Sequence, residues 1–210
     1  AALERLNRLG IKTAPVTIVD GQPILGYNPH ALALALDLKL VNIKGPDSAW
    51  LAQKFTVVLK ATIRATSQFT DKQLDTNVTW REQKLRDLIL HIFSFAQLAS
   101  ISHKTGRMEN PDLVRQTATT SSITTSAEIK SYGVSVLHDV ISFLGSPKIS
   151  LTKTISTHYG GHVTALELMS IILRHGTHHL KQLYWHMETN LGMCPEEPAT
   201  TSDSVSYTHL

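Results

Sequence analysis

Four long stretches with the hydrophobic period of an α-helix dominate the sequence and limit what the chain can fold into. Apolar residues recur every three or four positions over roughly residues 47–69, 82–103, 126–145 and 163–190, with loops rich in Thr, Ser, Asn, Gly and Pro between them. Long amphipathic helices bury their apolar stripes against one another in a bundle. The sequence therefore predicts a mainly α fold, a four-helix bundle, with residues 106–125 as a long loop over one end.

A shorter segment with a different pattern precedes the bundle. Residues 1–9 have a helical pattern that ends at Gly10, a residue that commonly stops helices. Residues 13–27 are rich in apolar and β-branched residues on both sides of Asp20 and Gly21, which is the pattern of a hairpin. The stretch "HALALALDLKL" follows as a short helix. We expect a small α+β unit here.

These patterns divide the chain into four parts. We expect an N-terminal unit over residues 1–41, a linker over 42–47, the bundle over 48–198 and a disordered tail over 199–210. The first residue is Ala and already lies in a helical pattern, so we expect the sequence to begin part-way through a longer protein. The ending "SVSYTHL" does not resemble a natural terminus, and we assign it no structure.

Composition excludes several classes of function. The 20 Lys and Arg are scattered among 17 Asp and Glu, so no basic patch predicts a nucleic-acid partner. A single cysteine, Cys194, excludes an internal disulfide framework and fits a reducing compartment. No apolar run reaches the roughly 20 residues of a membrane span. We expect a cytoplasmic protein with no membrane partner, and a homodimer remains open.

Histidines interrupt the apolar pattern of the last helical stretch. The segment "LRHGTHHLKQLYWHM" (173–187) holds four of them. At about 100° per residue, His175 and His179 lie one above the other at the edge of the apolar face, with His186 two turns further on. In the second helical stretch, His91 lies at the edge of a similar stripe. That stripe consists of Leu85, Leu88, Ile92, Phe95 and Ala99.

Two imidazoles four residues apart, with a third from a neighbouring helix, can hold one metal ion and leave coordination positions open. Such a donor set suits Zn²⁺ or another borderline transition metal. The alternative is that these histidines are satisfied core or surface residues. Gly176 follows His175, so the His-Glu-x-x-His arrangement of metalloproteases is absent. His178 is expected to point away from the pair, and Asp87, one turn before His91, either orients a histidine or is solvated.

The segments "LRDLILHIFSFAQLA" and "LRHGTHHLKQL", with "LGMCPEEP" after the latter, resemble the DinB-like family of four-helix bundles. That family includes metal-dependent transferases that act with low-molecular-weight thiols. The resemblance implies a metal held by His91, His175 and His179, with Zn most favoured and Ni, Mn or Fe as alternatives. It also implies a glutathione-like thiol and a small electrophile as partners. Three further positions fit the family: Trp80, Tyr159 and Gly160.

The N-terminal unit resembles the C-terminal half of a glutaredoxin, a thioredoxin-type fold, from the "TAP" that opens its first strand and the glycine after its second. This resemblance implies a cis peptide before Pro15 and a contact of Ala14 and Pro15 with a bound thiol tripeptide. The half of the domain that would carry the redox cysteines is missing, so we expect this unit to be redox-inactive.

The sequence thus favours a metal-dependent transferase of a small thiol to an electrophile. Three neutral imidazoles leave a metal ion its full charge, which lowers the pKa of a thiol that reaches it. The alternative is a non-enzymatic, metal-stapled binding or regulatory module attached to a redox domain.

Overall fold

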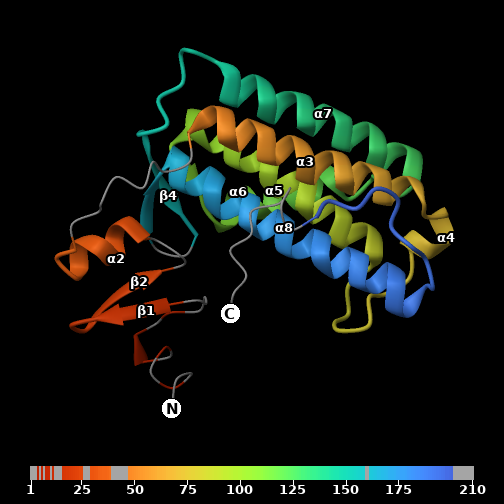
Figure 1. The fold of residues 1–210 in the computed structure, drawn as a ribbon, viewed down its shortest axis with the longest axis horizontal. Coiled ribbons are helices and arrows are strands. Elements are labelled where there is room, and N and C mark those ends of the chain that lie inside the picture. Colours follow the sequence, from red (N-terminus) through yellow and green to blue (C-terminus); the bar gives the residue numbers. More distant parts are fainter. Residues whose placement is uncertain are drawn as a thin grey trace.

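The computed structural model describes residues 4, 6, 8, 9, 11, 16–25, 29–38, 47–158 and 161–200. This part of the chain is mainly helical, and four long helices run side by side in it (Figure 1). They are α3 (Ser48–Ser67), α5 (Leu85–Thr105), α7 (Ser126–Gly145) and α8 (Ala165–Asn190). The predicted mainly α fold is confirmed, and every boundary of these helices lies within three residues of its expected position.

The four helices enclose one apolar core. Both α3 and α5 pack against α7 and α8, so α3 and α5 occupy opposite corners of the bundle. The expected apolar face of α8 is buried at Met169, Leu173 and Leu180. Helix α5 is buried more completely than its stripe predicts, because Ile89 and Phe93 are also fully covered. A further helix, α6 (Asn110–Thr120), packs on α5 from outside the four-helix core.

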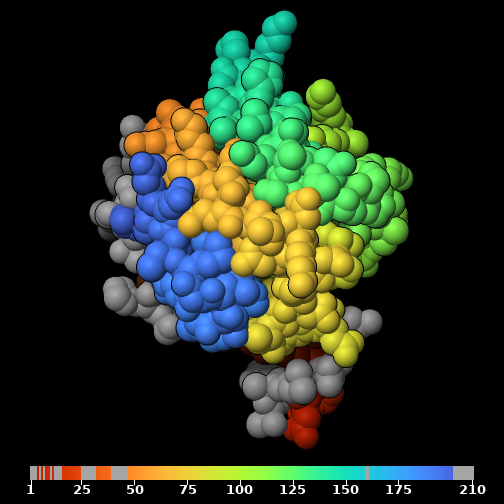
Figure 2. All heavy atoms as spheres, turned by 90° about the vertical axis from the view of Figure 1, so that its right-hand side faces the viewer, coloured from red at the N-terminus to blue at the C-terminus, as the bar shows by residue number. Residues whose placement is uncertain are grey.

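The connection into α5 folds back on itself and lies beside the end of α8. Helix α4 (Asp71–Leu74) ends just before it, and Asn77 pairs with Lys84 across the loop. The hydroxyl of Thr79 lies 3.5 Å from the Asn190 side chain at the end of α8. Figure 2 shows the same arrangement from the end of the bundle, where this segment (yellow) meets α8 (blue). Since α5 begins where α8 ends, the two helices run antiparallel.

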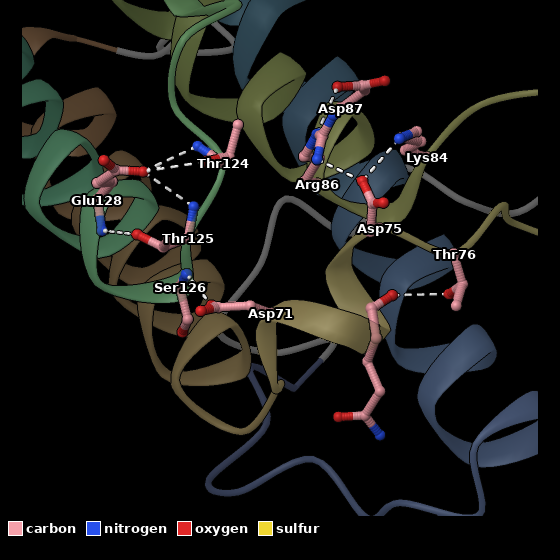
Figure 3. A network of polar contacts seen from close by, with 11 residues as sticks. Asp71, Asp75, Thr76, Lys84, Arg86, Asp87, Thr124, Thr125, Ser126 and Glu128 are labelled. Carbon is pink, nitrogen blue, oxygen red and sulfur yellow. Dashed lines mark hydrogen bonds and ion pairs between the residues drawn. The ribbon is translucent and has the colours of Figure 1, made fainter.

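Polar contacts fix the start of α7 against α4 (Figure 3). The Glu128 carboxylate accepts hydrogen bonds from the backbone N–H groups of Thr124 (3.0 Å) and Thr125 (2.9 Å), and these bonds lower the pKa of Glu128 to about 2. The Thr125 hydroxyl in turn accepts from the Glu128 N–H, which completes a capping box. The Ser126 N–H donates to Asp71 at 2.8 Å. The beginning of α7 is thereby tied to the first residue of α4.

The segment before α3 contains the expected hairpin and short helix. Strand β1 (Val16–Val19) pairs antiparallel with β2 (Gln22–Leu25), and α2 (Pro29–Ala35) follows. Asp20 and Gly21 have φ of 47° and 82°, which are the left-handed values of a type I′ hairpin turn. The Asp-Gly pair therefore forms the turn that the sequence predicts.

Several predictions fall on residues outside the described ranges. These are the contact residue Ala14, the cis peptide at Pro15, the Tyr159-Gly160 pair, most of the linker and the last ten residues. The division into a glutaredoxin-like unit, linker and bundle stays a prediction.

The expectation of one long loop over residues 106–125 is wrong, because this stretch contains β3 (Arg107–Met108) and α6. Strand β3 joins β4 (Thr154–Thr157) and β5 (Gly161–Thr164) in a small mixed sheet ordered β3-β4-β5. The hydrophobic pattern did not predict helix α6, because few of its residues are apolar. It is held instead by the buried carboxylate of Asp112, which pairs with Arg107 and Arg115, each at 3.3 Å.

Candidate metal centre

Helices α5 and α8 bring three histidines together on their shared side. The Nε2 atom of His175 lies 2.8 Å from Nε2 of His91 and 3.2 Å from Nε2 of His179. One ring nitrogen from each of the three residues lies within 4.8 Å of those of the other two. Residues 84 positions apart in the sequence thus present their nitrogens to one point, as the helical spacing predicts.

Two of the three nitrogen-to-nitrogen distances match what one metal ion would require. Two nitrogens that each lie about 2.0 to 2.1 Å from a Zn²⁺ ion are roughly 2.8 to 3.4 Å apart at octahedral to tetrahedral angles. The two distances to His175 fall in this range. The donor set consists of three imidazoles with no carboxylate or thiolate, which suits Zn, Ni, Cu and Fe better than Mg or Ca.

A hydrogen bond outside the cluster sets the tautomer of His179. Its Nδ1 lies 2.7 Å from Oε1 of Gln182, one turn further along α8. Since an amide oxygen can only accept, Nδ1 carries the hydrogen and donates it, and Nε2 presents a lone pair to the other two histidines. Gln182 did not enter the sequence prediction. Its position three residues after a candidate ligand on the same helix is the signal that could have identified it.

The three imidazoles are neutral at physiological pH. Burial lowers the pKa of His91 to about 3, with help from the charges of His175 and His179. Burial likewise lowers the pKa of His175 to about 4, and it lowers the pKa of His179 although the Gln182 hydrogen bond opposes it. A neutral imidazole is the form that binds metal. A metal ion would accept the lone pairs of neutral imidazole nitrogens that lie this close together, so the arrangement suits metal binding.

The aromatic ring of Phe95 packs against two of the three histidines. The Phe95 ring stacks on His175, with centroids 5.3 Å apart, and contacts His91 at 4.0 Å. His179 is buried, whereas His91, His175 and Phe95 are half-buried. The cluster therefore lies at the edge of the apolar core, with two of its three imidazoles partly exposed to solvent.

The other candidate residues take different positions. His178 is exposed, as expected from its direction on α8. His186 is buried against Trp80, with ring centroids 5.8 Å apart, instead of joining the cluster or meeting solvent. Asp87 is half-exposed and lies 3.8 Å from Nε of Arg86, so it does not orient His91. Cys194 is a free, exposed thiol beyond the end of α8.

Comparison with known proteins adds no family assignment: no family model and no curated protein matches the chain. Among the described residues, no helix is both long and apolar enough to cross a bilayer. The geometry of the three histidines therefore carries the functional argument.

Proposed function

We propose that the protein binds one divalent transition-metal ion through His91, His175 and His179. The observation that carries the proposal is the meeting of three imidazoles from two helices, with Nε2 of His175 at 2.8 Å and 3.2 Å from those of His91 and His179 and all three within 4.8 Å. In a merely structural role, each buried imidazole would more commonly pair with a backbone or side-chain group of opposite polarity. Here His175 has two other imidazoles as its nearest nitrogen partners.

We further propose that the site transfers a small thiol to an electrophile. The resemblance of the two histidine-bearing segments to DinB-like proteins supports this reading, and so does the donor set. A divalent ion held by three neutral ligands keeps its full charge and lowers the pKa of a thiol that reaches it. In the overall reaction, the thiol loses its proton to solvent, sulfur forms a bond to an electrophilic carbon, and the leaving group departs with the electron pair of the bond that breaks.

The protein's own residues provide position and environment for this reaction. Gln182 holds His179 with its Nε2 lone pair directed inward. Phe95 covers one side of His91 and His175 and limits access of water from that side. No described carboxylate bonds to the three histidines, so the site has no general base comparable to the glutamate of metalloproteases. These features favour a nucleophile supplied by the substrate over hydrolysis by activated water.

The test is to load the purified protein separately with Zn²⁺, Ni²⁺, Mn²⁺ and Fe²⁺ and to measure consumption of 1-chloro-2,4-dinitrobenzene. Glutathione, mycothiol and bacillithiol serve as the thiol donors. We expect at least one pairing to react faster than the same mixture with a His175→Ala/His179→Ala variant. If the wild type binds metal, the variant does not, and no pairing shows a difference, the transferase proposal fails. The metal site then serves a binding or regulatory module.

A further inference from the structure

A fourth histidine is buried where the loop before α5 meets α8. His186 is 2% exposed, and among the described residues neither of its ring nitrogens has a hydrogen-bond partner. The Trp80 ring packs against it edge-on, with ring centroids 5.8 Å apart. His186 follows His179 by seven residues, which is about 10.5 Å along the axis of a helix, so it is separate from the metal centre. Buried polar groups usually have a partner, and this imidazole therefore needs an explanation.

Trp80 lies in the tip of that loop, which we define as residues 79–82. The base of the loop is fixed by its own contacts, because the Val78 side chain is buried and the Val78 N–H donates to the Gln83 carbonyl at 2.8 Å. The tip contacts α8 through the Trp80 ring, which also packs edge-on against Trp185 at a centroid distance of 5.5 Å. Figure 2 shows this region (yellow) against α8 (blue). The tip can therefore leave α8 while the base of the loop stays in place.

The surroundings of His186 do not suit a positive charge. Burial lowers the pKa of His186, and only the uncharged Asn190 side chain opposes this. None of the charged residues that the tip, α5 and α8 carry in this region is among the causes of the shift. These residues are Arg81 and Glu82 on the tip, Arg86 and Asp87 on α5, and Lys181 and Glu188 on α8. An imidazolium would bury two N–H donors without acceptors among the described residues, which is costly.

From this geometry we infer that His186 and Trp80 form a pH-sensitive latch. Neutral His186 accommodates the Trp80 ring and keeps the tip docked on α8. A proton on His186 favours release of the tip, because water then reaches the imidazolium. Histidine is the side chain that takes up a proton in the mildly acidic range, so the latch responds there. Release uncovers the Trp80 ring beside Trp185, which is already 49% exposed.

The linkage between proton uptake and release sets the size of the effect. In the released form His186 is exposed and titrates at its ordinary pKa of 6.5. In the docked form it stays neutral, because burial lowers its pKa. The docked form therefore has its full advantage above pH 6.5 and loses it as the pH falls. The ratio of released to docked molecules should rise by up to roughly thirtyfold between pH 8 and pH 5.

The test measures exchange of the Trp80 indole N–H with deuterium by NMR at pH 8 and pH 5, relative to free tryptophan at the same pH. This N–H is buried without a hydrogen-bond partner among the described residues, so its exchange reports release of the tip. We expect the relative rate to rise toward the thirtyfold limit as the pH falls. His186→Phe and His186→Asn cannot take up a proton and should show no rise. His138→Asn removes an exposed histidine from α7 and should behave as the wild type.

Three results would overturn the latch. The first is a relative rate in the wild type that is equal at pH 8 and pH 5, and the second is the same rise in either folded His186 variant. The third is an equal rise in exchange of the backbone N–H of Val136, a fully buried residue of α7, because the whole bundle would then be opening. Circular dichroism shows whether each variant folds. An NMR titration of His186 in the wild type needs no variant, and a pKa at or above 6.5 would also refute the latch.

Discussion

Gly133 is the position on α7 where the structure predicts the clearest effect of one added methyl group. An ideal Cβ at this residue would lie 2.6 Å from Cζ and 2.9 Å from Cε1 of Phe93, and 3.0 Å from Cγ1 of Ile63. Carbon atoms in van der Waals contact are about 3.5 to 4.0 Å apart. The Phe93 ring would therefore have to move away by about 1 Å. It is fully buried, and the Tyr132 ring stands edge-on to it at a centroid distance of 6.3 Å.

Two terms set the size of the effect of Gly133→Ala. Overpacking of a buried ring costs about 1 to 3 kcal/mol. Replacing glycine by alanine inside a helix contributes about 1 kcal/mol in the opposite direction. The net expectation is a loss of about 1 kcal/mol in the free energy of unfolding, which corresponds to roughly 2 to 4 °C in Tm for a chain of this size.

Gly176→Ala provides a matched control on α8. A Cβ there would lie 3.6 Å from Ile92 and 3.8 Å from Val58, which are ordinary contacts. Only the helix-propensity term remains, so this variant should gain about 0.5 to 1 kcal/mol. Urea denaturation of both variants, monitored by circular dichroism at 222 nm, measures the difference. The packing described for α5 and α7 would be wrong if Gly133→Ala were as stable as Gly176→Ala.

Three further predictions concern the metal site and the helix starts. Gln182→Met should weaken Zn²⁺ binding by about tenfold or more in competition titrations, because His179 loses its hydrogen-bond acceptor. Gln182→Glu keeps an acceptor and should bind Zn²⁺ as the wild type does. Equal Zn²⁺ affinities of Gln182→Met and the wild type would show that Gln182 does not orient His179. The metal-free protein should lose stability as the pH falls from 6.5 toward 4. In this range His91 and His175 bind protons in the unfolded chain but not in the folded one, because their folded pKa values are about 3 and about 4. Urea midpoints across that range check this, and a His91→Asn/His175→Asn variant should show a flatter dependence. Glu128→Ala should lower Tm at neutral pH, and the gap to the wild type should close as the pH falls from 4.5 toward the folded pKa of about 2; a gap independent of pH would contradict the capping role.

Much of this fold could be predicted because its signals are local. The long helices follow from hydrophobic period, and the α7 boundaries from its capping sequence and its terminal glycine. The hairpin turn follows from Asp20 and Gly21. Helix α6 and the β3-β4-β5 sheet could not be predicted in the same way. The sheet depends on contacts distant in sequence, such as the 2.6 Å hydrogen bond from Ser156 to Glu109, and α6 has few apolar residues to mark it as a helix.

The histidine cluster also combines features that the local sequence predicts with one that depends on tertiary packing. His175 and His179 follow from i, i+4 spacing on one helix, and His91 follows from its place at the edge of a second stripe. The packing of α5 against α8 then places the three histidines together, and a hydrophobic period alone does not determine which helices of a bundle are neighbours.

X-ray absorption at the zinc edge of the Zn²⁺-loaded protein examines the proposed centre itself. A three-histidine site predicts one zinc per chain, with imidazole scattering from three ligands at about 2.0 to 2.1 Å and no sulfur in the absence of added thiol. The His175→Ala/His179→Ala variant should lose the bound zinc. A sulfur ligand at about 2.3 Å would place the ion at Cys194 instead. That result, or zinc retained unchanged by the double variant, would contradict the assignment of the metal to His91, His175 and His179.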